Sequence, residues 1–232
     1  TNRELKEYMM AITEKKYNID VVSNPEFLSQ GTAVKDMLSP SRIVVGVSTK
    51  KAQQVMKELY KGFESPLLFV SPESAELIKY ASNSYLAVKL SYINEIADLC
   101  DKVGADIQEV SFGIGLDPRI GTKYLASGVG FGGPALTLDT KVMQQLAQDK
   151  EVELSILNAA LKVNDKRSEA LIQKIKSVMG QIAGHRFAVL GLSYKGNTDD
   201  VRKSPAFNFI EALLQEEGRI IAYDTNSTLQ FK

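Results

Sequence analysis

SPESAELIKYASNSYLAVKLSYINEIADLCDKVG, residues 71–104, is the longest uninterrupted helical pattern in the chain. Ser71 is a good N-cap, Pro72 suits the first helical position, and Gly104 can end the helix in a left-handed conformation. Neither proline nor glycine interrupts residues 73–103. The stretch therefore predicts a single helix on the order of 45–50 Å long.

Two apolar stripes run along this helix. One consists of Ile78, Ala81, Tyr85, Val88, Tyr92, Ile96, Leu99 and Val103, and the other of Leu86, Leu90, Ile93, Ala97 and Cys100. Two stripes predict burial on more than one side. Because the helix is longer than one small domain can cover, we expect it to bridge two domains or to pack against its copy in a homodimer. Its charged and amide side chains exclude a membrane span.

Strand and helix patterns alternate on both sides of residues 71–104. Before them we expect a helix at 3–16, a strand at 19–23, a strand at 42–47, a helix at 51–63 and a strand at 66–70. After them we expect helices at 106–112, 138–148 and 152–179, a strand at 187–192, a helix at 205–216 and a strand at 219–223. This order predicts an α/β protein in which partial Rossmann-like elements at both ends flank a helical central domain.

Composition narrows the class of function. The chain has 232 residues with 28 Lys and Arg against 28 Asp and Glu, which argues against nucleic acid or a membrane surface as the main partner. A single cysteine, Cys100, indicates a reducing compartment, so we expect a cytoplasmic protein. Cys100 lies on an apolar stripe, where a buried, inert thiol is the expectation. The start at Thr1 rather than Met hints at a fragment or a processed product.

Two glycine-bearing stretches suggest ligand loops. Residues 128–133, GVGFGG, match G-x-G-x-x-G, but no strand pattern precedes them, so a loop close to a ligand and a plain tight turn both stay open. Residues 191–198, GLSYKGNT, lack the lysine directly before Thr198 that a nucleotide phosphate loop needs, which excludes nucleoside-triphosphatase chemistry. Lys195 and Arg202 follow a strand, where open sheets bind ligands, although solvated surface charge explains them equally well.

Three further polar residues are candidates for chemistry. Lys79 and Asn83 are four residues apart and share one helix face, where an ammonium and an amide could position a phosphate, a hydroxyl or an oxyanion. Alternatively, Lys79 and Asn83 are ordinary polar residues on a solvent-exposed face of the helix. Glu26 is a candidate acid or base by its position after an expected strand. The only histidine, His185, receives no role, and no metal site is expected.

Together these motifs resemble the UDP-glucose/GDP-mannose dehydrogenase family. The resemblance rests on NPEFLSQGTA at 24–33, SAELIKYASN at 74–83 with INEIA at 93–97, GLDPRIG at 115–121 through GFGG at 130–133, and VLGLSYKGNTDDVRKSP at 189–205. It covers nearly the whole chain in the family's order. It implies an NAD-dependent enzyme that oxidises the primary hydroxyl of UDP-glucose to a carboxylate in two hydride transfers, with the aldehyde held on a cysteine.

The resemblance also implies domains. Residues 1–70 would be the C-terminal remnant of an NAD-binding Rossmann domain, and residues 185–232 the incomplete start of a UDP-binding domain. Residues 71–184 would be the central helical dimerisation domain with its substrate loop. The rest of both outer domains would lie beyond Thr1 and Lys232.

Site residues follow from the same resemblance. The resemblance implies four catalytic residues. Glu26 would be the carboxylate that helps the covalent intermediate turn over, and Lys79 the cation that stabilises the oxyanion. Asn83 would be the partner of Lys79 at the reacting hydroxyl, and Asp139 an orienting carboxylate. Phe27 and Leu28 would line the sugar site, Arg119 would reach the substrate of the neighbouring subunit, and Lys195 would face the substrate. Tyr124, Leu125, Gly128 and Gly132 would form the uridine-diphosphate loop, and Arg202 would face the NAD cofactor.

Departures from the family pattern change the expected activity. Where the family has Ser-Cys-Phe-Pro-Lys-Asp this chain has PALTLD at 134–139, so Ala135 stands at the nucleophile position, Leu138 replaces the lysine, and Gln30 stands where a second glutamate is usual. Without a thiolate the covalent step is lost. Without the glycine fingerprint we expect no tight NAD binding by this chain alone. We expect an inactive or severely impaired relative, with a non-catalytic dimerisation or nucleotide-sugar-binding module, or a fragment without independent function, as alternatives.

Overall fold

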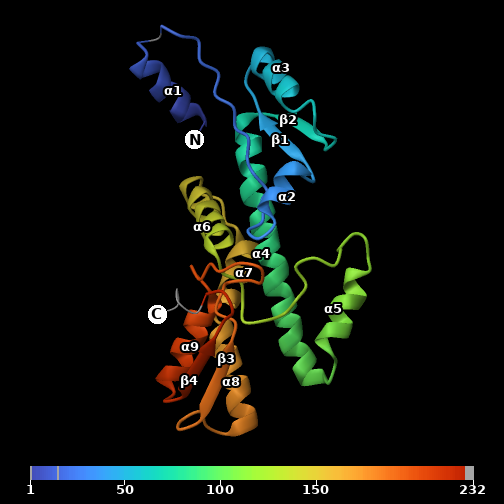
Figure 1. Cartoon of the computed structure of the whole chain (residues 1–232), viewed down its shortest axis with the longest axis vertical. Helices are drawn as coiled ribbons and strands as arrows, with labels where there is room; N and C mark the ends of the chain where they lie inside the picture. The colour runs from blue at the N-terminus through green and yellow to red at the C-terminus, as the bar shows by residue number, and fades with distance from the viewer. Residues whose placement is uncertain (1, 15, 228–232) are drawn as a thin grey trace. The chain divides into compact units, whose positions relative to one another are not determined.

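The structure is a computed structural model that describes residues 2–14 and 16–227. It divides into two compact units, residues 1–82 and 83–232, and the boundary falls within α4 (Pro72–Val103), the long green helix of Figure 1. Ser71 caps this helix by accepting a hydrogen bond from the Ser74 amide at 3.2 Å, and Gly104 ends it with φ of 74°. The predicted single helix is confirmed.

Unit 1 contains a βαβ arrangement. It begins with α1 (Asn2–Ile12) and α2 (Ala33–Leu38), and α3 (Lys50–Leu59) connects strand β1 (Ile43–Gly46) to strand β2 (Leu67–Val70). The strands are parallel, in a register that runs from Ile43 opposite Leu67 to Gly46 opposite Val70. All four residues of β1 are buried. A Cβ on Gly46 would lie 2.7 Å from Cα of Pro72, so glycine lets β1 pass close to the start of α4.

Three local predictions in unit 1 were wrong. Residues 19–23 form no strand; Ser23 alone makes an isolated antiparallel bridge to Gly46. Pro25 follows closely and has no N–H to continue a ladder, and the side chain of Asn24 instead donates to the Val44 carbonyl at 2.8 Å. The first helix ends at Ile12 rather than 16, with residue 15 outside the described residues. The short α2 was missed, because six residues carry too little periodicity to recognise.

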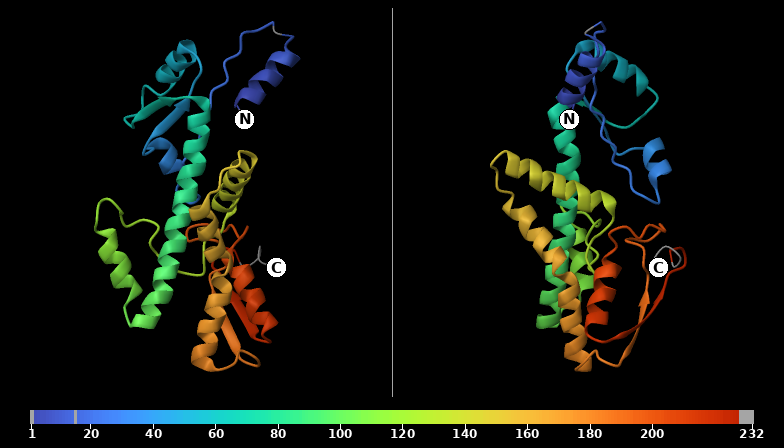
Figure 2. Two further views of the ribbon diagram at one scale, coloured as in Figure 1. Left: turned by 180° about the vertical axis from the view of Figure 1, so that it is seen from behind. Right: turned by 90° about the vertical axis from the view of Figure 1, so that its left-hand side faces the viewer.

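Unit 2 combines the rest of α4 with five helices and a second parallel strand pair. The helices are α5 (Ile107–Gly115), α6 (Pro134–Asp149), α7 (Ser155–Asp165), α8 (Arg167–Met179) and α9 (Pro205–Gln215), and the strands are β3 (Arg186–Leu190) and β4 (Arg219–Tyr223). Arg186 lies opposite Arg219 and Leu190 opposite Tyr223. The right-hand view of Figure 2 shows α8 and α9 on the same side of this pair, around a core of Ile172, Ile182 and Leu213. These strand pairs and helices confirm the α/β prediction.

Helix boundaries in unit 2 differ from expectation. The helix predicted over 152–179 is two helices that meet at Lys166, although no glycine or proline marks the break. The helix predicted from residue 138 starts at Pro134. The helix predicted over 106–112 continues through Gly113 and ends at Gly115, where a Cβ would come within 3.2 Å of Thr122 Cα. Tertiary contacts override local propensity at these points.

The two predicted stripes of α4 differ in burial within the single chain. In the second stripe Ile93, Ala97 and Cys100 are buried, which confirms the expected burial of the thiol, and Leu86 and Leu90 are partly buried. In the first stripe Ile78, Val88 and Ile96 are partly buried, whereas Tyr85, Tyr92, Leu99 and Val103 are exposed. The predicted burial on a second side is therefore only partial within one chain. Among the described residues, no helix is both long enough and apolar enough to cross a membrane.

Candidate functional site

In unit 1, Glu26 and Lys79 form an ion pair. Lys79 Nζ lies 2.8 Å from Glu26 Oε1, and the Leu28 amide donates to Glu26 Oε2 at 2.6 Å. The Lys79 side chain is only 16% exposed, whereas that of Glu26 is 57% exposed. The carboxylate is therefore fixed by two donors while one side of it faces solvent.

The charge state of Glu26 follows from these contacts. Partial burial is the largest single influence and raises the pKa of Glu26, but it is outweighed by the Lys79 hydrogen bond, the Leu28 amide and the Lys79 charge, which together lower the pKa. The carboxyl group is therefore ionised at neutral pH and acts as an acceptor or a base rather than an acid.

Phe27 extends the group of contacts around Lys79. The guanidinium carbon of Arg42 lies 3.8 Å from the centroid of the Phe27 ring, and Lys79 Nζ lies 5.7 Å from the same centroid. Arg42 also donates to Ser82 Oγ of α4 at 3.2 Å. Both cations hold the ring by cation–π attraction. Sequence reasoning missed Arg42, whose position before a strand carries no distinguishing signal.

In unit 2, Asn83 donates to Asp139 Oδ2 at 2.5 Å. Asn83 is one turn after Lys79 along α4, so adjacent turns of that helix each bond a carboxylate. Ala135 lies in the first turn of α6, one turn before Asp139, and is exposed. A side chain at position 135 thus shares a helix face with Asp139 and lies at the electropositive end of α6.

The glycine-rich loop, residues 128–133, is held by two buried polar side chains, Asn94 and Arg167, and by the partly buried Asn164. The Gly128 amide donates to Asn94 Oδ1 at 2.8 Å, and its carbonyl accepts from Arg167 Nε at 2.7 Å. Asn164 Oδ1 accepts from the Phe131 amide at 2.7 Å, and Asn164 Nδ2 donates to the Phe131 carbonyl at 3.1 Å. The loop is thereby fastened to α4, α7 and α8.

Three of the loop's glycines are needed for conformation or space. Gly130 has φ of 105° and Gly133 φ of 81°. A Cβ on Gly132 would lie 2.0 Å from the Lys203 carbonyl oxygen, and one on Gly133 would lie 2.5 Å from the Tyr194 ring. At Gly128, by contrast, a Cβ would meet no described atom within 4 Å. The loop thus packs directly against the segment that precedes α9.

The other two residues expected in the uridine-diphosphate loop differ in burial. Leu125 is buried, whereas Tyr124 is partly exposed and adopts φ of 64°. Arg119 is highly exposed and doubles back onto Asp117, with its Nη2 2.6 Å from Asp117 Oδ2. Within this chain Arg119 is therefore engaged by its own turn, apart from Asn83, Asp139 and the glycine-rich loop.

After β3, Lys195 and Arg202 lie in a tightly bonded loop. Arg202 Nη2 is 2.6 Å from Asp200 Oδ2, and Lys195 Nζ is 5.8 Å from the Tyr194 ring centroid. Asp224 at the end of β4 accepts from the amides of Leu192 and Ser193 at 2.8 and 3.1 Å. Together with the amides of Asn226 and Ser227 they hold the pKa of Asp224 well below its usual range, and Leu192 makes the largest contribution. Desolvation raises the pKa of Asp224, but these hydrogen bonds outweigh it.

A cavity of about 880 Å³ lies between the glycine-rich loop, α6 and the start of α9. Its lining includes Phe131, Pro134, Leu138, Lys141, Arg202 and Lys203. This volume is in the range of small-molecule sites, and the lining combines apolar surface with more cations than anions. Such a cavity suits a ligand with a flat ring and an anionic group.

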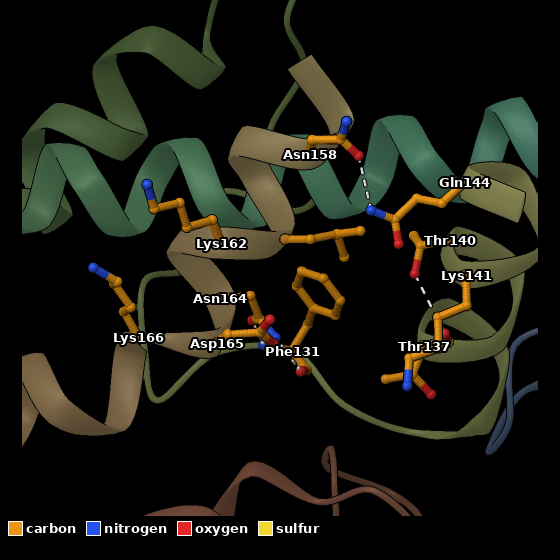
Figure 3. A pocket seen from close by; sticks show the side chains of 11 residues that line it. Phe131, Thr137, Thr140, Lys141, Gln144, Asn158, Lys162, Asn164, Asp165 and Lys166 are labelled. Atoms are coloured by element: carbon orange, nitrogen blue, oxygen red, sulfur yellow. Dashed lines mark hydrogen bonds between the residues drawn. The ribbon is translucent and has the colours of Figure 1, made fainter. Parts of the chain in front are cut away.

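A smaller cavity of about 340 Å³ lies between α6 and α7 (Figure 3). Phe131 is one of its lining residues, and Gln144 and Asn158, which also line it, form a hydrogen bond of 2.8 Å. Figure 3 shows the ammonium ends of Lys162 and Lys166 turned away from Phe131. The cations therefore do not converge on one ligand position. Within residues 2–14 and 16–227, no group of three acidic, histidine or cysteine side chains is placed to hold a metal ion.

Sequence models of three domains match the chain. The NAD binding domain of the UDP-glucose/GDP-mannose dehydrogenase family matches residues 1–64, its central domain residues 73–166, and its UDP binding domain residues 188–231. The chain belongs to this family. NAD is thus a cofactor of the family, and the matches follow the family's domain order.

Individual relatives agree with the family assignment. The chain is 40% identical to UDP-glucose 6-dehydrogenase TuaD of Bacillus subtilis over 97% of its length and 49% of the relative's. It is 46% identical to a UDP-glucose 6-dehydrogenase of Rhizobium meliloti over 91% of its length and 50% of the relative's. The chain therefore spans about half the length of the curated relatives it matches.

A solved structure supports the fold. The UDP-glucose dehydrogenase of Pyrobaculum islandicum superposes with a TM-score of 0.92 at 35% identity, covering 97% of this chain and 52% of that one. A UDP-D-ManNAc dehydrogenase of Pyrococcus horikoshii, at 23% identity and a TM-score of 0.84, shares the fold.

The residues present do not fit the pyrophosphate end of an NAD site. Dinucleotide sites place the pyrophosphate at a glycine-rich turn between a strand and a helix. In the described part of unit 1, β1 leads into α3 through Val47, Ser48 and Thr49, and β2 leads into α4 through Ser71. Neither turn contains glycine. These two turns therefore lack the glycines of a pyrophosphate-binding turn.

Sequence reasoning missed the side chains that fasten the glycine-rich loop. Asn94 sits within an apolar stripe of α4, and a polar residue at such a position was a usable signal for a buried partner. Asn164 and Arg167 carried no comparable signal, because they lie near a helix break that the sequence does not announce.

Proposed function

We propose that this chain is a nucleotide-sugar-binding member of the UDP-glucose 6-dehydrogenase lineage that does not complete the oxidation. Ala135 carries the proposal: it occupies the first turn of α6, while Asp139 one turn later keeps its bond to Asn83. The framework around the reacting position is retained and the nucleophile is absent. A methyl group cannot form the covalent thiohemiacetal on which the second oxidation depends.

The remaining residues take the roles that the family resemblance assigns. Lys79 stabilises an oxyanion with Glu26 as the associated carboxylate, and Asn83, oriented by Asp139, binds the reacting hydroxyl. Phe27 and Leu28 line the sugar site. The ion pair at 2.8 Å and the bonded amide support these assignments, since both pairs are fixed before ligand binds.

The glycine-rich loop and the cavity beside it bind the uridine diphosphate in this proposal. Tyr124 and Leu125, just before the glycine-rich loop, form the uridine-diphosphate site with Gly128 and Gly132, and Lys195 approaches the substrate. Arg202, on the cavity wall, is the residue proposed to face NAD. The match of residues 188–231 to a UDP binding domain supports a uridine nucleotide as the ligand.

A second candidate function is dimerisation without catalysis. The exposed stripe of Tyr85, Tyr92, Leu99 and Val103 on α4 favours a homodimer, because these large side chains recur at helical spacing on one face. Arg119 would then reach the partner's substrate. A Tyr92→Glu variant should shift sedimentation toward monomer, with the exposed Gln145→Glu on α6 as a control. A monomer in the unmodified chain would remove this candidate.

Two broader assignments accompany the proposal. We place domain boundaries at residues 1–70, 71–184 and 185–232, near the ranges matched by the three family models. We assign the protein to the cytoplasm on the strength of its single cysteine.

Calorimetric titration with UDP-glucose, followed by an assay of NADH formation, tests the proposed function. We expect saturable binding and no steady turnover. Steady turnover at an ordinary enzyme rate of about 10 per second would overturn the inactivity, and an absence of binding would overturn the nucleotide-sugar role.

An Ala135→Cys variant locates the ligand. Its new thiol should react with iodoacetamide faster than buried Cys100 of the unmodified chain, because the start of α6 favours a thiolate. UDP-glucose should slow that reaction. Equal reaction rates with and without saturating ligand would place the sugar elsewhere.

A further inference from the structure

Arg167, the first residue of α8, is a buried cation outside the proposed chemistry. Its side chain is 8% exposed, its Nε donates to the Gly128 carbonyl at 2.7 Å, and its Nη1 lies 2.6 Å from Asp98 Oδ1. Asp98 is on α4, as is Asn94, which accepts from the Gly128 amide. Both polar groups of one loop residue are thus fixed by side chains.

We propose that Arg167 is a positioning residue that sets the conformation of the glycine-rich loop for its nucleotide ligand. This inference rests on the proposed function, in which that loop binds uridine diphosphate. Arg167 acts through the loop backbone and touches no ligand. Its fork of donors spans two acceptors at once, one in the loop and one on α4.

The break between α7 and α8 makes this arrangement possible. Asn164 in the last turn of α7 bonds the Phe131 backbone on both sides, and Arg167 bonds Gly128. Asn164 and Arg167 are three residues apart and reach loop positions three residues apart. Helix α7 ends at Asp165 and α8 begins at Arg167, so the junction lies directly beside the loop.

A loop that is fixed before binding loses less conformational entropy when ligand arrives. A Cβ on Gly128 would meet no described atom within 4 Å, so no side chain packs over that position. The hydrogen bonds of Asn94 and Arg167 are the contacts that fix its backbone.

The test compares Arg167→Met with Lys174→Met in the full chain. Lys174 pairs with Asp101 at 2.6 Å, so it also joins α8 to α4, but its side chain is 58% exposed and its ion pair does not involve the loop. UDP is the probe in calorimetry, and hydrogen exchange reports on the Gly128 amide. Exchange at Val189 and Ile220, in the β3–β4 core, reports on unit 2 as a whole.

We expect Arg167→Met to weaken UDP binding about tenfold to a hundredfold, the range for losing a charged hydrogen bond. The Gly128 amide should exchange faster while Val189 and Ile220 stay protected. Lys174→Met should leave both readouts unchanged. Equal UDP affinity and equal Gly128 protection in Arg167→Met would overturn the proposal.

Arg167→Lys keeps the test decisive if the methionine variant fails to fold. Lysine retains the charge beside Asp98 but cannot serve both acceptors in the same geometry, so we expect intermediate affinity and intermediate Gly128 protection. Full recovery of both would show that charge alone suffices and would overturn the positioning role. If the unmodified chain binds no UDP, the proposed function fails, and exchange at Gly128 alone decides whether Arg167 holds the loop.

Discussion

The segment from Asn24 to Leu28 and the glycine-rich loop are both irregular, and both are assigned to the ligand, yet they are held in different ways. In the first, an ion pair with a half-exposed carboxylate and one backbone amide fix Glu26. In the second, side chains of Asn94, Asn164 and Arg167 bond the backbone from within unit 2.

The two regions differ in the contacts that make them rigid. An ion pair with a half-exposed carboxylate contributes little to stability and is screened by salt, so loss of the Lys79 contact should change the pKa of Glu26 more than the stability of unit 1. Bonds from buried side chains to backbone are costly to break, because the freed groups lose water as well as partner. The loop should therefore tolerate substitution far less than the segment.

Gly132→Ala should give the largest effect. Its Cβ would lie 2.0 Å from a backbone oxygen, that of Lys203, and this contact cannot be relieved by rotating a side chain. We expect a loss of about 3 kcal/mol or more in the free energy of unfolding of unit 2, measured by urea denaturation. Gly128→Ala is the control in the same loop, with an expected change of about 0.5 kcal/mol or less. Similar losses in the two variants would contradict the packing of the loop.

Asn164→Ala should come next. It leaves the amide and carbonyl of Phe131 without their partner, and we expect a loss of about 2 kcal/mol. The matched control is Asn158→Ala on the same helix, whose bond to Gln144 is exposed and should contribute about 0.5 kcal/mol or less. If Asn158→Ala were as destabilising as Asn164→Ala, the contrast between buried and exposed bonds would not hold.

Lys79→Met should have the smallest effect on stability and a clear effect on titration. A lowered pKa means that Glu26 contributes stability above its unfolded value of 4.5, and that this contribution is lost as pH falls through the folded pKa. Because the carboxylate is half-exposed, we expect about 1 kcal/mol or less, further reduced by salt. Carbon NMR titration should show the Glu26 pKa rising in the variant. An unchanged pKa would mean that Lys79 does not set the charge of Glu26.

Much of the fold was predictable from local signals. The caps at Ser71 and Gly104 and the absence of breakers between them defined α4, and short apolar runs marked the four strands that form the two parallel pairs. The break at Lys166 was not predictable, because it depends on Asn164 and Arg167 reaching a loop more than thirty residues earlier. The strand predicted at 19–23 was wrong for a similar reason. A strand needs a neighbouring strand to pair with, and only Ser23 makes such a bridge.

The residues of the candidate site could be predicted from the sequence, but the contacts between them could not. Motifs singled out Glu26 and Lys79, which are 53 positions apart, and nothing in either motif stated that they pair. Asn83 and Asp139 are 56 positions apart, and their motifs likewise do not indicate the hydrogen bond between them. Partners such as Arg42 and Arg167 belong to no motif, because they serve the site through packing and backbone contacts rather than through chemistry.

Titration of the isotope-labelled chain with UDP, followed by amide NMR, tests whether the glycine-rich loop is a nucleotide site. We expect saturable shifts concentrated at residues 124–133 and along the lining of the 880 Å³ cavity, including Lys203 and Phe207. Shifts confined to other surfaces, or none at saturating UDP, would contradict the claim that this loop is a nucleotide site retained without its nucleophile.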